Sequence, residues 1–474
     1  MNTLKTKLLG CVWLLALLIT IFPFALSILY AMPCKDDYVM ASFLVGSNNL
    51  LSDSIAGTNY VYNTWNGMWP FLFVEFIFNP LNYAPAYSLL TGIEILLMFL
   101  AFVIILYSYI REILRFFFDC NESLYCRALY LCSVMAFLNA DFYRQIFYWF
   151  VGCAAYLLSV VFVMLSQICA MRYFGKRSFA RGLVLALTGF IGCFCYQLGI
   201  FMGIFYLMCM FRKPVNDRTT VIKDLIPLIY MVGGGLFSLL APGNFCRYNS
   251  LEEHADFVSI LAVTIRNTGR SLGNVMSSPL YLVFMAVGIF LGYRMQKSFL
   301  RVKNICLYLL ASLFGVLFPL AIGYPDGTVV NRIKFLTNFL IIIWSVFISI
   351  DVGAYIKNKV KVGMAVSLAL LSLVILSISG IYGRRYENIP WVYTLSHMRI
   401  LQNEKHYYAS ALKKIYSSSD QNVVITLPDE HIGSELLITP LDMYPGSDEL
   451  TKYSCKVIGK KSIRVLSNST LSEK

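Results

Sequence analysis

The chain has 474 residues, of which 58% are hydrophobic and only 14% are charged, and its formal net charge is +13. Soluble globular domains carry about 25% charged residues, so this composition excludes an ordinary soluble protein. The basic residues form short groups between apolar segments, which argues against a nucleic-acid-binding surface and is typical of an all-α polytopic membrane protein.

Eleven segments are apolar and long enough to cross about 30 Å of hydrocarbon as helices. They cover residues 8–31, 86–110, 124–140, 150–171, 180–194, 197–211, 224–241, 278–294, 304–323, 333–350 and 362–382. Two of them, 124–140 and 180–194, are short, and 180–194 could form one long helix with 197–211. The stretch 69–85 is also apolar, but its prolines and Glu75 favour a re-entrant or surface-lying segment.

Lys and Arg residues give the orientation of these spans. When the N-terminus is placed in the cytoplasm and the spans alternate, every cytoplasmic loop receives basic residues and the opposite loops receive few. We therefore expect about eleven transmembrane helices in a membrane domain at 1–382, with the C-terminus on the exterior side.

Residues 383–474 are polar and charged, and we expect them to form a small exterior α+β domain. Residues 397–418 have helical periodicity, while 422–428 and 461–466 have the alternation typical of strands.

Unusual polar residues gather in the loops predicted to lie outside. In chain order these candidates are Asp36, Asp37, Tyr38, Arg144, Trp149, Gln197, Asn244, Arg247 and Arg332. Each type has an ordinary role, because aromatic residues anchor span ends and arginines contact lipid headgroups. Their collection on one face, while the other face holds mainly basic anchors, favours a functional site.

These residue types suit a phosphorylated sugar. Aromatic rings stack on the C–H faces of a sugar, amides and carboxylates pair with its hydroxyls, and arginine binds phosphate through bidentate, charge-assisted hydrogen bonds. Transfer from such a donor needs a carboxylate that deprotonates the acceptor hydroxyl and cations that stabilise the departing phosphate.

Several short motifs resemble a known family. An Asp-Asp pair after the first span is the hallmark of polytopic glycosyltransferases of the GT-C type. The chain more specifically resembles the bacterial and phage-encoded O-antigen-modifying, serotype-converting glucosyltransferases. The shared elements are DDY (36–38), YWFVG (148–152), APGNFCR (241–247), the late Arg332 and the tail YPGSDELTKYSCKVIG (444–459). Related proteins often have Glu before the Gln of the small exterior turn, where this chain has Tyr196.

The resemblance implies an inverting transfer of a hexose, expected to be glucose, from polyprenyl-phosphate-sugar to a lipid-linked O-antigen or other surface polysaccharide. The reaction would take place on the periplasmic face of the bacterial inner membrane. Asp37 is favoured slightly over Asp36 as the base, because Lys35 could neutralise Asp36 in an ion pair. The phosphate would leave toward Arg247, with Arg144 or Arg332 assisting. A divalent metal bridging a carboxylate and the phosphate is an open alternative.

The sequence leaves two other functions open. A flippase or transporter of lipid-linked saccharide would be expected to carry charged groups near the membrane midplane and inverted repeats, and neither pattern is evident. A polysaccharide polymerase would use exterior arginines, but the early Asp-Asp pair is less expected there.

Overall fold

The computed structural model describes residues 2–83, 89–215, 217–251, 254–295, 298–324, 326–359, 389–427, 436–437 and 451–467. The predicted span 362–382 and residues 444–450 of the tail motif lie outside these ranges. The described chain is helical apart from one two-stranded parallel sheet.

The bundle is built from helices of very different lengths. Its elements are α1 (Asn2–Ile28), α2 (Asp36–Ser42), α3 (Leu50–Thr64), α4 (Trp69–Ile77), the 3₁₀ turn η1 (Pro80–Asn82), α5 (Leu89–Phe118), α6 (Ser123–Leu138), α7 (Arg144–Phe147), α8 (Phe150–Gly152), the π-helical η2 (Cys153–Leu157), α9 (Leu158–Gly175), α10 (Phe179–Gly192), the 3₁₀ turn η3 (Tyr196–Leu198), α11 (Gly199–Arg212), α12 (Arg218–Leu239), α13 (Pro242–Asn249), α14 (Phe257–Met276), α15 (Pro279–Met295), α16 (Val302–Gly323) and α17 (Asn331–Lys359).

The prediction of a polytopic membrane protein is confirmed in its general form. Among the described residues, six helices are long and apolar enough to cross a membrane, and two bent pairs raise the number to eight if each pair is one span. The predicted segments 180–194 and 197–211 form one such pair, α10 with η3–α11, bent by 118°. Helix α4 has only nine residues, which is too few to span.

Helix α17 is the most buried of the candidate spans. It contacts α6, α14, α15 and α16, and its Trp344 is fully buried. The Trp344 ring meets those of Phe201, Tyr308 and Phe347 with centroids 5.7–5.8 Å apart. This aromatic packing fixes the helix whose first turn carries Arg332.

Glycines allow α15 and α17 to approach closely. A Cβ atom on Gly353 would lie 2.0 Å from the backbone oxygen of Ile289, and one on Gly292 would lie 2.1 Å from that of Ile350. Gly288 and Gly292 form a small-xxx-small pair, the pattern that lets membrane helices pack backbone to backbone.

We expect Gly353→Ala to destabilise the protein by about 1–3 kcal/mol, because the added methyl group must push α15 and α17 apart. The measurement is thermal unfolding in detergent, followed by size-exclusion chromatography. Gly233→Ala on α12 is the control, because no atom lies within 4 Å of its added Cβ. Equal melting temperatures for the two variants would contradict the close contact.

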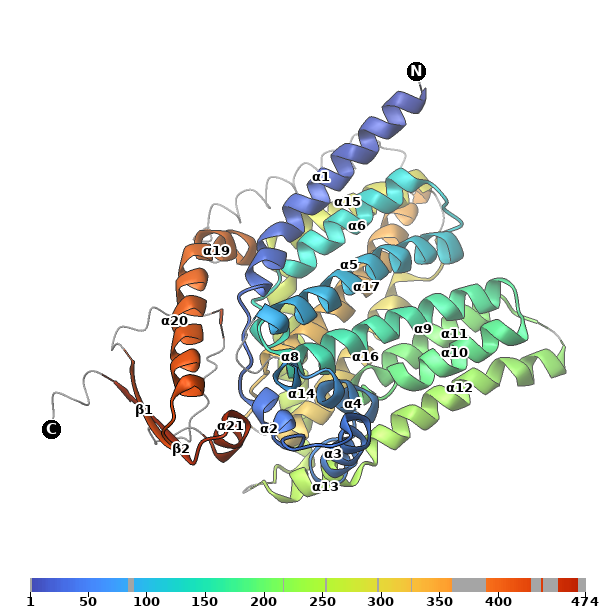
Figure 1. Cartoon of the computed structure of the whole chain (residues 1–474). Coiled ribbons are helices and arrows are strands. Elements are labelled where there is room, and N and C mark those ends of the chain that lie inside the picture. The colour runs from blue at the N-terminus through green and yellow to red at the C-terminus, as the bar shows by residue number, and fades with distance from the viewer. Residues whose placement is uncertain are drawn as a thin grey trace.

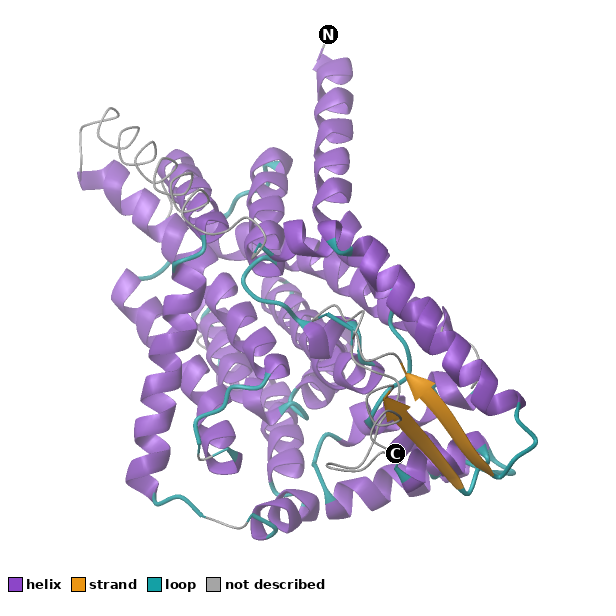
Figure 2. Cartoon of the chain, turned by 90° about the vertical axis from the view of Figure 1, so that its left-hand side faces the viewer, coloured by secondary structure: helices purple, strands orange, loops and turns teal. Residues whose placement is uncertain are grey.

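Short helices cover one end of the bundle. Helix α1 leads from the N-terminus to α2, so the N-terminus and the layer of α2, α3, α4 and α13 lie at opposite ends of α1 (Figure 1). In both views the strands β1 (Asn422–Leu427) and β2 (Ser462–Ser467) lie at the side of the bundle, on the same end as α2 (Figures 1 and 2).

The secondary-structure predictions for the C-terminal segment are confirmed by α20 (Met398–Ser417), β1 and β2, which are accompanied by α19 (Pro390–Ser396) and α21 (Lys452–Ile458). These elements do not pack only on one another. Leu412 and Ile415 of α20 share an apolar cluster with Tyr38 and Ala41 of α2. The C-terminal segment therefore supports the loop that carries the acidic pair.

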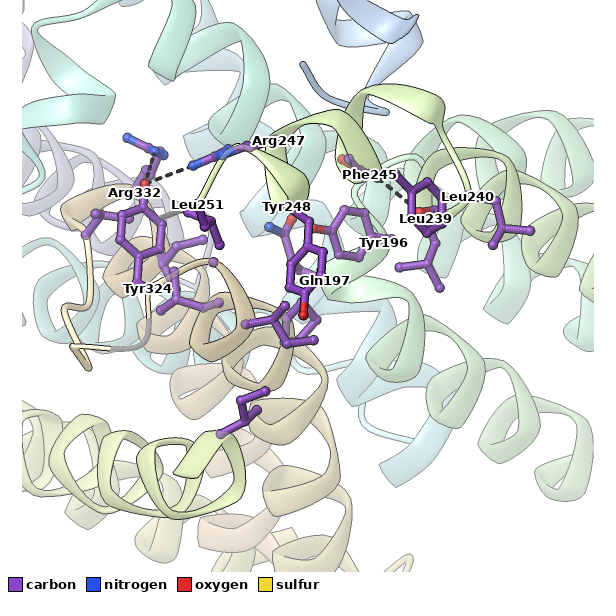
Figure 3. A pocket seen from close by; sticks show the side chains of 18 of the residues that line it. Tyr196, Gln197, Leu239, Leu240, Phe245, Arg247, Tyr248, Leu251, Tyr324 and Arg332 are labelled. Carbon is purple, nitrogen blue, oxygen red and sulfur yellow. Dashed lines mark hydrogen bonds between the residues drawn. The ribbon is translucent and has the colours of Figure 1, made fainter. Parts of the chain in front are cut away.

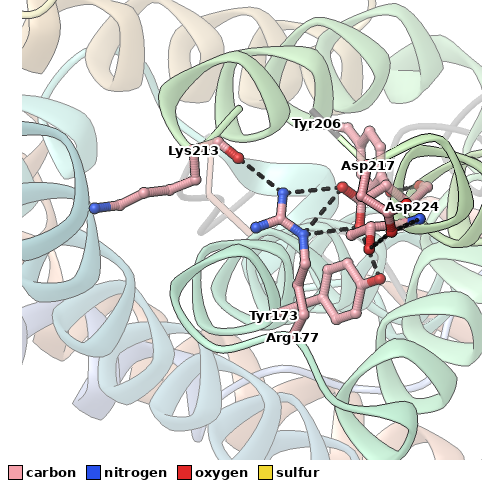
Figure 4. A network of polar contacts seen from close by, with 7 residues as sticks. Tyr173, Arg177, Tyr206, Lys213, Asp217 and Asp224 are labelled. Atoms are coloured by element: carbon pink, nitrogen blue, oxygen red, sulfur yellow. Dashed lines mark hydrogen bonds and ion pairs between the residues drawn. The ribbon is translucent and has the colours of Figure 1, made fainter. Parts of the chain in front are cut away.

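A polar network joins the ends of α9, α11 and α12. The Arg177 guanidinium binds both oxygens of the buried Asp224 carboxylate, and it also donates 2.8 Å to the carbonyl of Lys213 (Figure 4). The Tyr173 hydroxyl donates to Asp224 at 2.9 Å. Because the polar atoms of this network satisfy one another, we interpret it as a structural lock between α9, α11 and α12.

Candidate active site

The two adjacent aspartates have different surroundings. Asp37 is fully buried, and its Oδ2 and Oδ1 accept hydrogen bonds from the backbone N–H groups of Cys34 (2.9 Å) and Val151 (3.1 Å). The backbone carbonyl of Asp37 accepts a hydrogen bond from Asn79 at 2.9 Å. Asp37 thus ties α2 to α8 and to η1, which is a structural role. Asp36 is only half-buried.

The pKa values of the two aspartates are also shifted by different surroundings. Burial raises the pKa of Asp37 to about 8, and its two backbone donors limit the rise. Burial also raises the pKa of Asp36, but the charges of Arg332, Lys35 and Arg247 oppose this effect. The buried Glu75 has a pKa well above its ordinary value, first through burial and then through the nearby Asp36 and Asp37. Asp36 is therefore the group of the three best suited to carry negative charge at neutral pH.

The residue before the pair has an unusual backbone. Lys35 has φ 45° and ψ −118°, a region that non-glycine residues rarely occupy. Such conformations persist only where the surrounding structure enforces them, and they are frequent at functional sites. Here the turn at Lys35 starts α2, whose first residue is Asp36.

Arg247 and Arg332 converge on one oxygen atom. Arg247 Nη2 lies 3.1 Å and Arg332 Nη2 lies 3.3 Å from the hydroxyl oxygen of Tyr324 (Figure 3). Neither arginine forms a salt bridge with any described residue. Two guanidinium groups that share one oxygen and have no described carboxylate in ion-pair contact form a site suited to an anion with several oxygens.

Aromatic rings hold both guanidinium groups in place. The Cζ atom of Arg247 lies 5.1 Å from the centre of the Trp65 ring, and that of Arg332 lies 5.9 Å from Trp149 and 5.7 Å from Tyr156. Tyr156 belongs to the π-helical η2, a type of irregularity frequent at functional sites. Stacking on rings orients an arginine without cancelling its charge.

A cavity of about 530 Å³ opens beside the two arginines. Its polar lining includes Tyr156, Tyr196, Gln197, Asn244, Arg247, Tyr324 and Arg332, and its apolar lining comes mainly from the ends of α12 and α16. Asn244 donates to the backbone carbonyls of Ser238 (2.8 Å) and Leu239 (3.1 Å), which ends α12 and turns the chain into α13. The cavity has the size and mixed polarity of a small-molecule site.

A second, mostly apolar cavity of about 420 Å³ adjoins the first. The two share Tyr196, Leu239 and Pro319 as walls. Leu228, Val232, Leu236 and Phe314 line the apolar one, between α12 and α16. Together the two cavities offer a charged, polar end and a hydrocarbon-lined end.

The predicted residues fall into two groups. Gln197, Asn244, Arg247 and Arg332 line the first cavity, and Asp36 lies within electrostatic range of the two arginines. Trp149 is buried and lies beneath Arg332.

The other predicted residues point elsewhere. Tyr38 is fully buried in the apolar cluster with the C-terminal segment. Arg144 donates to the backbone carbonyl of Leu437 at 3.2 Å and is absent from the lining of the described cavities. Tyr156 and Tyr324 were missed because single tyrosines at span ends look like ordinary interfacial anchors in the sequence.

The residues at the site do not assemble into a metal centre. Within the ranges that the structure describes, no group of three or more His, Cys, Asp or Glu is close enough to hold a metal ion. Asp37 already uses both carboxylate oxygens for backbone N–H groups.

No protein-family model matches the sequence. No curated protein matches it either.

Proposed function

We propose that this protein is a membrane glycosyltransferase of the GT-C type. It transfers a hexose, expected to be glucose, from a polyprenyl-phosphate-linked donor to a lipid-linked O-antigen or other surface polysaccharide. The proposal places it in the bacterial inner membrane, with the N-terminus in the cytoplasm and the active site and C-terminus in the periplasm. The distribution of Lys and Arg residues supports this orientation.

The observation that carries the proposal is the convergence of Arg247 and Arg332 on the Tyr324 hydroxyl oxygen. A sugar phosphate presents several such oxygens, and two guanidinium groups can bind them in bidentate fashion. Both arginines also lie within electrostatic range of Asp36, so an anion-binding pair and a carboxylate lie near one another.

The proposed reaction is a single displacement. Asp36 takes the proton of an acceptor hydroxyl as the hydroxyl oxygen attacks the anomeric carbon. The bond between that carbon and the phosphate oxygen breaks, and the phosphate leaves with the electron pair. Arg247 and Arg332 stabilise the charge that develops on it. Because the nucleophile and leaving group lie on opposite sides of the sugar, the anomeric configuration inverts.

The adjoining apolar cavity supports a lipid-linked donor. Its wall of Leu228, Val232, Leu236 and Phe314 provides hydrocarbon contact next to the arginines. A polyprenyl chain could lie there while its phosphate reaches the guanidinium groups. In this assignment Asp36 acts as the base, and Asp37 holds the loop that carries it.

The proposed function is tested by deleting the gene in the strain that encodes this chain and restoring it on a plasmid. We expect deletion to remove a side-branch hexose from the surface polysaccharide, as measured by NMR and mass spectrometry, with chain length unchanged. A change in the length distribution would indicate a polymerase. A general loss of surface polysaccharide with normal repeat composition would indicate a transporter. Either result would overturn the proposal.

A further inference from the structure

A third cavity, of about 380 Å³, lies between α14 and the segment that joins α16 to α17. It is distinct from the two cavities described above, because it shares no lining residue with either. Helix α14 contributes Asn267, Arg270, Ser271 and Asn274, and the connecting segment contributes Asp326 and Thr328. Nearly every side chain that faces this space carries hydrogen-bonding groups.

The polar residues of α14 follow a helical spacing. Asn267, Arg270, Ser271 and Asn274 occupy positions i, i+3, i+4 and i+7, so they lie along one face of the helix. Arg270 and Asn274 are exposed, while Asn267 and Ser271 are buried. This face of α14 therefore has an exposed polar edge and a buried polar edge.

Asn267, on the buried edge, has an unsatisfied hydrogen-bond acceptor. The residue is 1% exposed, and its Nδ2 donates to the carbonyl of Gly327 at 3.3 Å. Its Oδ1 atom has no hydrogen-bond partner among the described residues. A buried amide oxygen normally has a donor, because leaving it without one is unfavourable. A ligand hydroxyl in this cavity would supply that donor.

The opposite wall is a rigid turn. Gly327 has φ 82°, and a Cβ atom there would lie 2.1 Å from Arg266 Nη2, so the Arg266 side chain packs directly on this glycine. Asp326 accepts hydrogen bonds from the backbone N–H and the hydroxyl of Thr328. These contacts fix the turn without any ligand.

The charges around the cavity favour a polar ligand over a strongly charged one. Lys334 forms an ion pair of 3.1 Å with Asp141. Hydrogen bonds from Thr328, and to a smaller extent the charge of Arg266, lower the pKa of the exposed Asp326. Arg270 is the lining cation that has no ion pair among the described residues. Asn and Arg side chains pair with vicinal hydroxyl groups, and the wall offers little apolar surface to a lipid chain.

The same segment forms a wall of both polar cavities. Tyr324, Val330 and Arg332 line the cavity with the arginine pair, whereas Asp326, Val329 and Lys334 line this one. A ligand here would thus lie directly across a short stretch of chain from the proposed leaving phosphate. The hydroxyl that reacts must belong to another part of the same polymer that reaches the arginine pair, because transfer requires direct contact with the anomeric carbon.

We propose that this cavity is the acceptor subsite and that it binds a sugar residue of the acceptor polysaccharide through Asn267, Arg270 and Asn274. This inference rests on the proposed function. It assigns to α14 the recognition of an acceptor sugar that does not itself react.

The test uses the full-length protein in detergent and the polysaccharide isolated from the gene-deletion strain, in its polyprenyl-linked form and after removal of the lipid. The variant is Arg270→Ala combined with Asn274→Ala, both at exposed positions. Thr268→Ala on the same helix and Arg301→Ala at the start of α16 are the controls, because neither lines the cavity. Binding is measured without donor, and transfer is measured with polyprenyl-phosphate-glucose.

We expect the double variant to weaken binding of both polysaccharide forms at least tenfold and to raise the acceptor KM by a similar factor. The donor KM and the rate at saturating acceptor should stay within twofold of the unmodified protein. Unchanged acceptor KM and binding would overturn the inference and leave the proposed function intact. Binding that depends on Arg270 and Asn274 without any transfer would support the subsite and contradict the proposed function. Displacement of the polysaccharide by phosphatidylglycerol vesicles would indicate a lipid-headgroup site and overturn the inference.

Discussion

Replacing Asp36 with asparagine is expected to lower the rate of sugar transfer by roughly 10²–10⁴-fold, the usual contribution of a general base. Asp36 is half-buried and makes no salt bridge with a described residue, so its loss should not unfold the protein. The measurement is transfer per amount of folded protein in detergent. Asp53→Asn in α3 is the matched control, because Asp53 lies in the same layer of short helices.

Asp37→Asn is expected to lower the amount of folded protein rather than the rate of sugar transfer. An asparagine keeps one acceptor oxygen but turns an N–H₂ group toward the second backbone donor, which costs about 1–3 kcal/mol. We expect less folded protein, with nearly normal activity in the fraction that folds. Loss of activity in a well-folded Asp37→Asn variant, with activity retained in Asp36→Asn, would reverse the two roles and restore the preference derived from the sequence.

Removing either member of the arginine pair is expected to reduce kcat/KM by roughly 10²–10³-fold, the effect of losing one donor to a developing anion. Arg332→Lys should recover only part of the loss, because an ammonium group cannot bind phosphate in bidentate fashion. Product inhibition by polyprenyl phosphate should weaken in parallel. Arg127→Ala is the control. The Cζ atom of Arg127 also lies over a tryptophan ring, 5.3 Å from the centre of Trp13, but Trp13 is on α1, far from the site.

Substitution of Arg332 is also expected to change the pH dependence of sugar transfer. The base acts in its ionised form, so activity rises with pH through the pKa of Asp36. The Arg332 charge lowers this pKa, and burial raises it. Arg332→Gln should therefore move the acid limb of the pH–rate profile to higher pH, whereas Arg144→Gln should leave it in place. An unmoved acid limb in Arg332→Gln would contradict the electrostatic contact with Asp36.

The sequence predicted the parts of the fold that depend on local pattern. Long apolar runs indicated the spans, and the periodicity of residues 397–418 and 422–428 indicated α20 and β1. The sequence could not predict that α2 would share an apolar cluster with α20, because contacts between residues so far apart depend on packing.

The candidate site was also predictable only in the features that do not depend on packing. The types and side of Arg247 and Arg332 were predictable, but their convergence on Tyr324 joins residues on three separate elements. The different burial of Asp36 and Asp37 depends on the backbone turn at Lys35 and on the N–H group of Val151. No sequence pattern distinguishes two adjacent aspartates in this way. Arg144 looked equivalent to the other exterior arginines, yet it binds the carbonyl of Leu437.

The cluster that joins α2 to α20 and β1 has a consequence for synthesis of the protein. The ribosome completes α2 early, but the residues that cover Tyr38 and Ala41 are translated only after α17. A nascent chain can therefore insert its early helices while α2, which begins at Asp36, still lacks the C-terminal residues that pack on it. On the proposed function, the enzyme would become active only near the end of its own translation, which would keep incomplete chains from consuming donor.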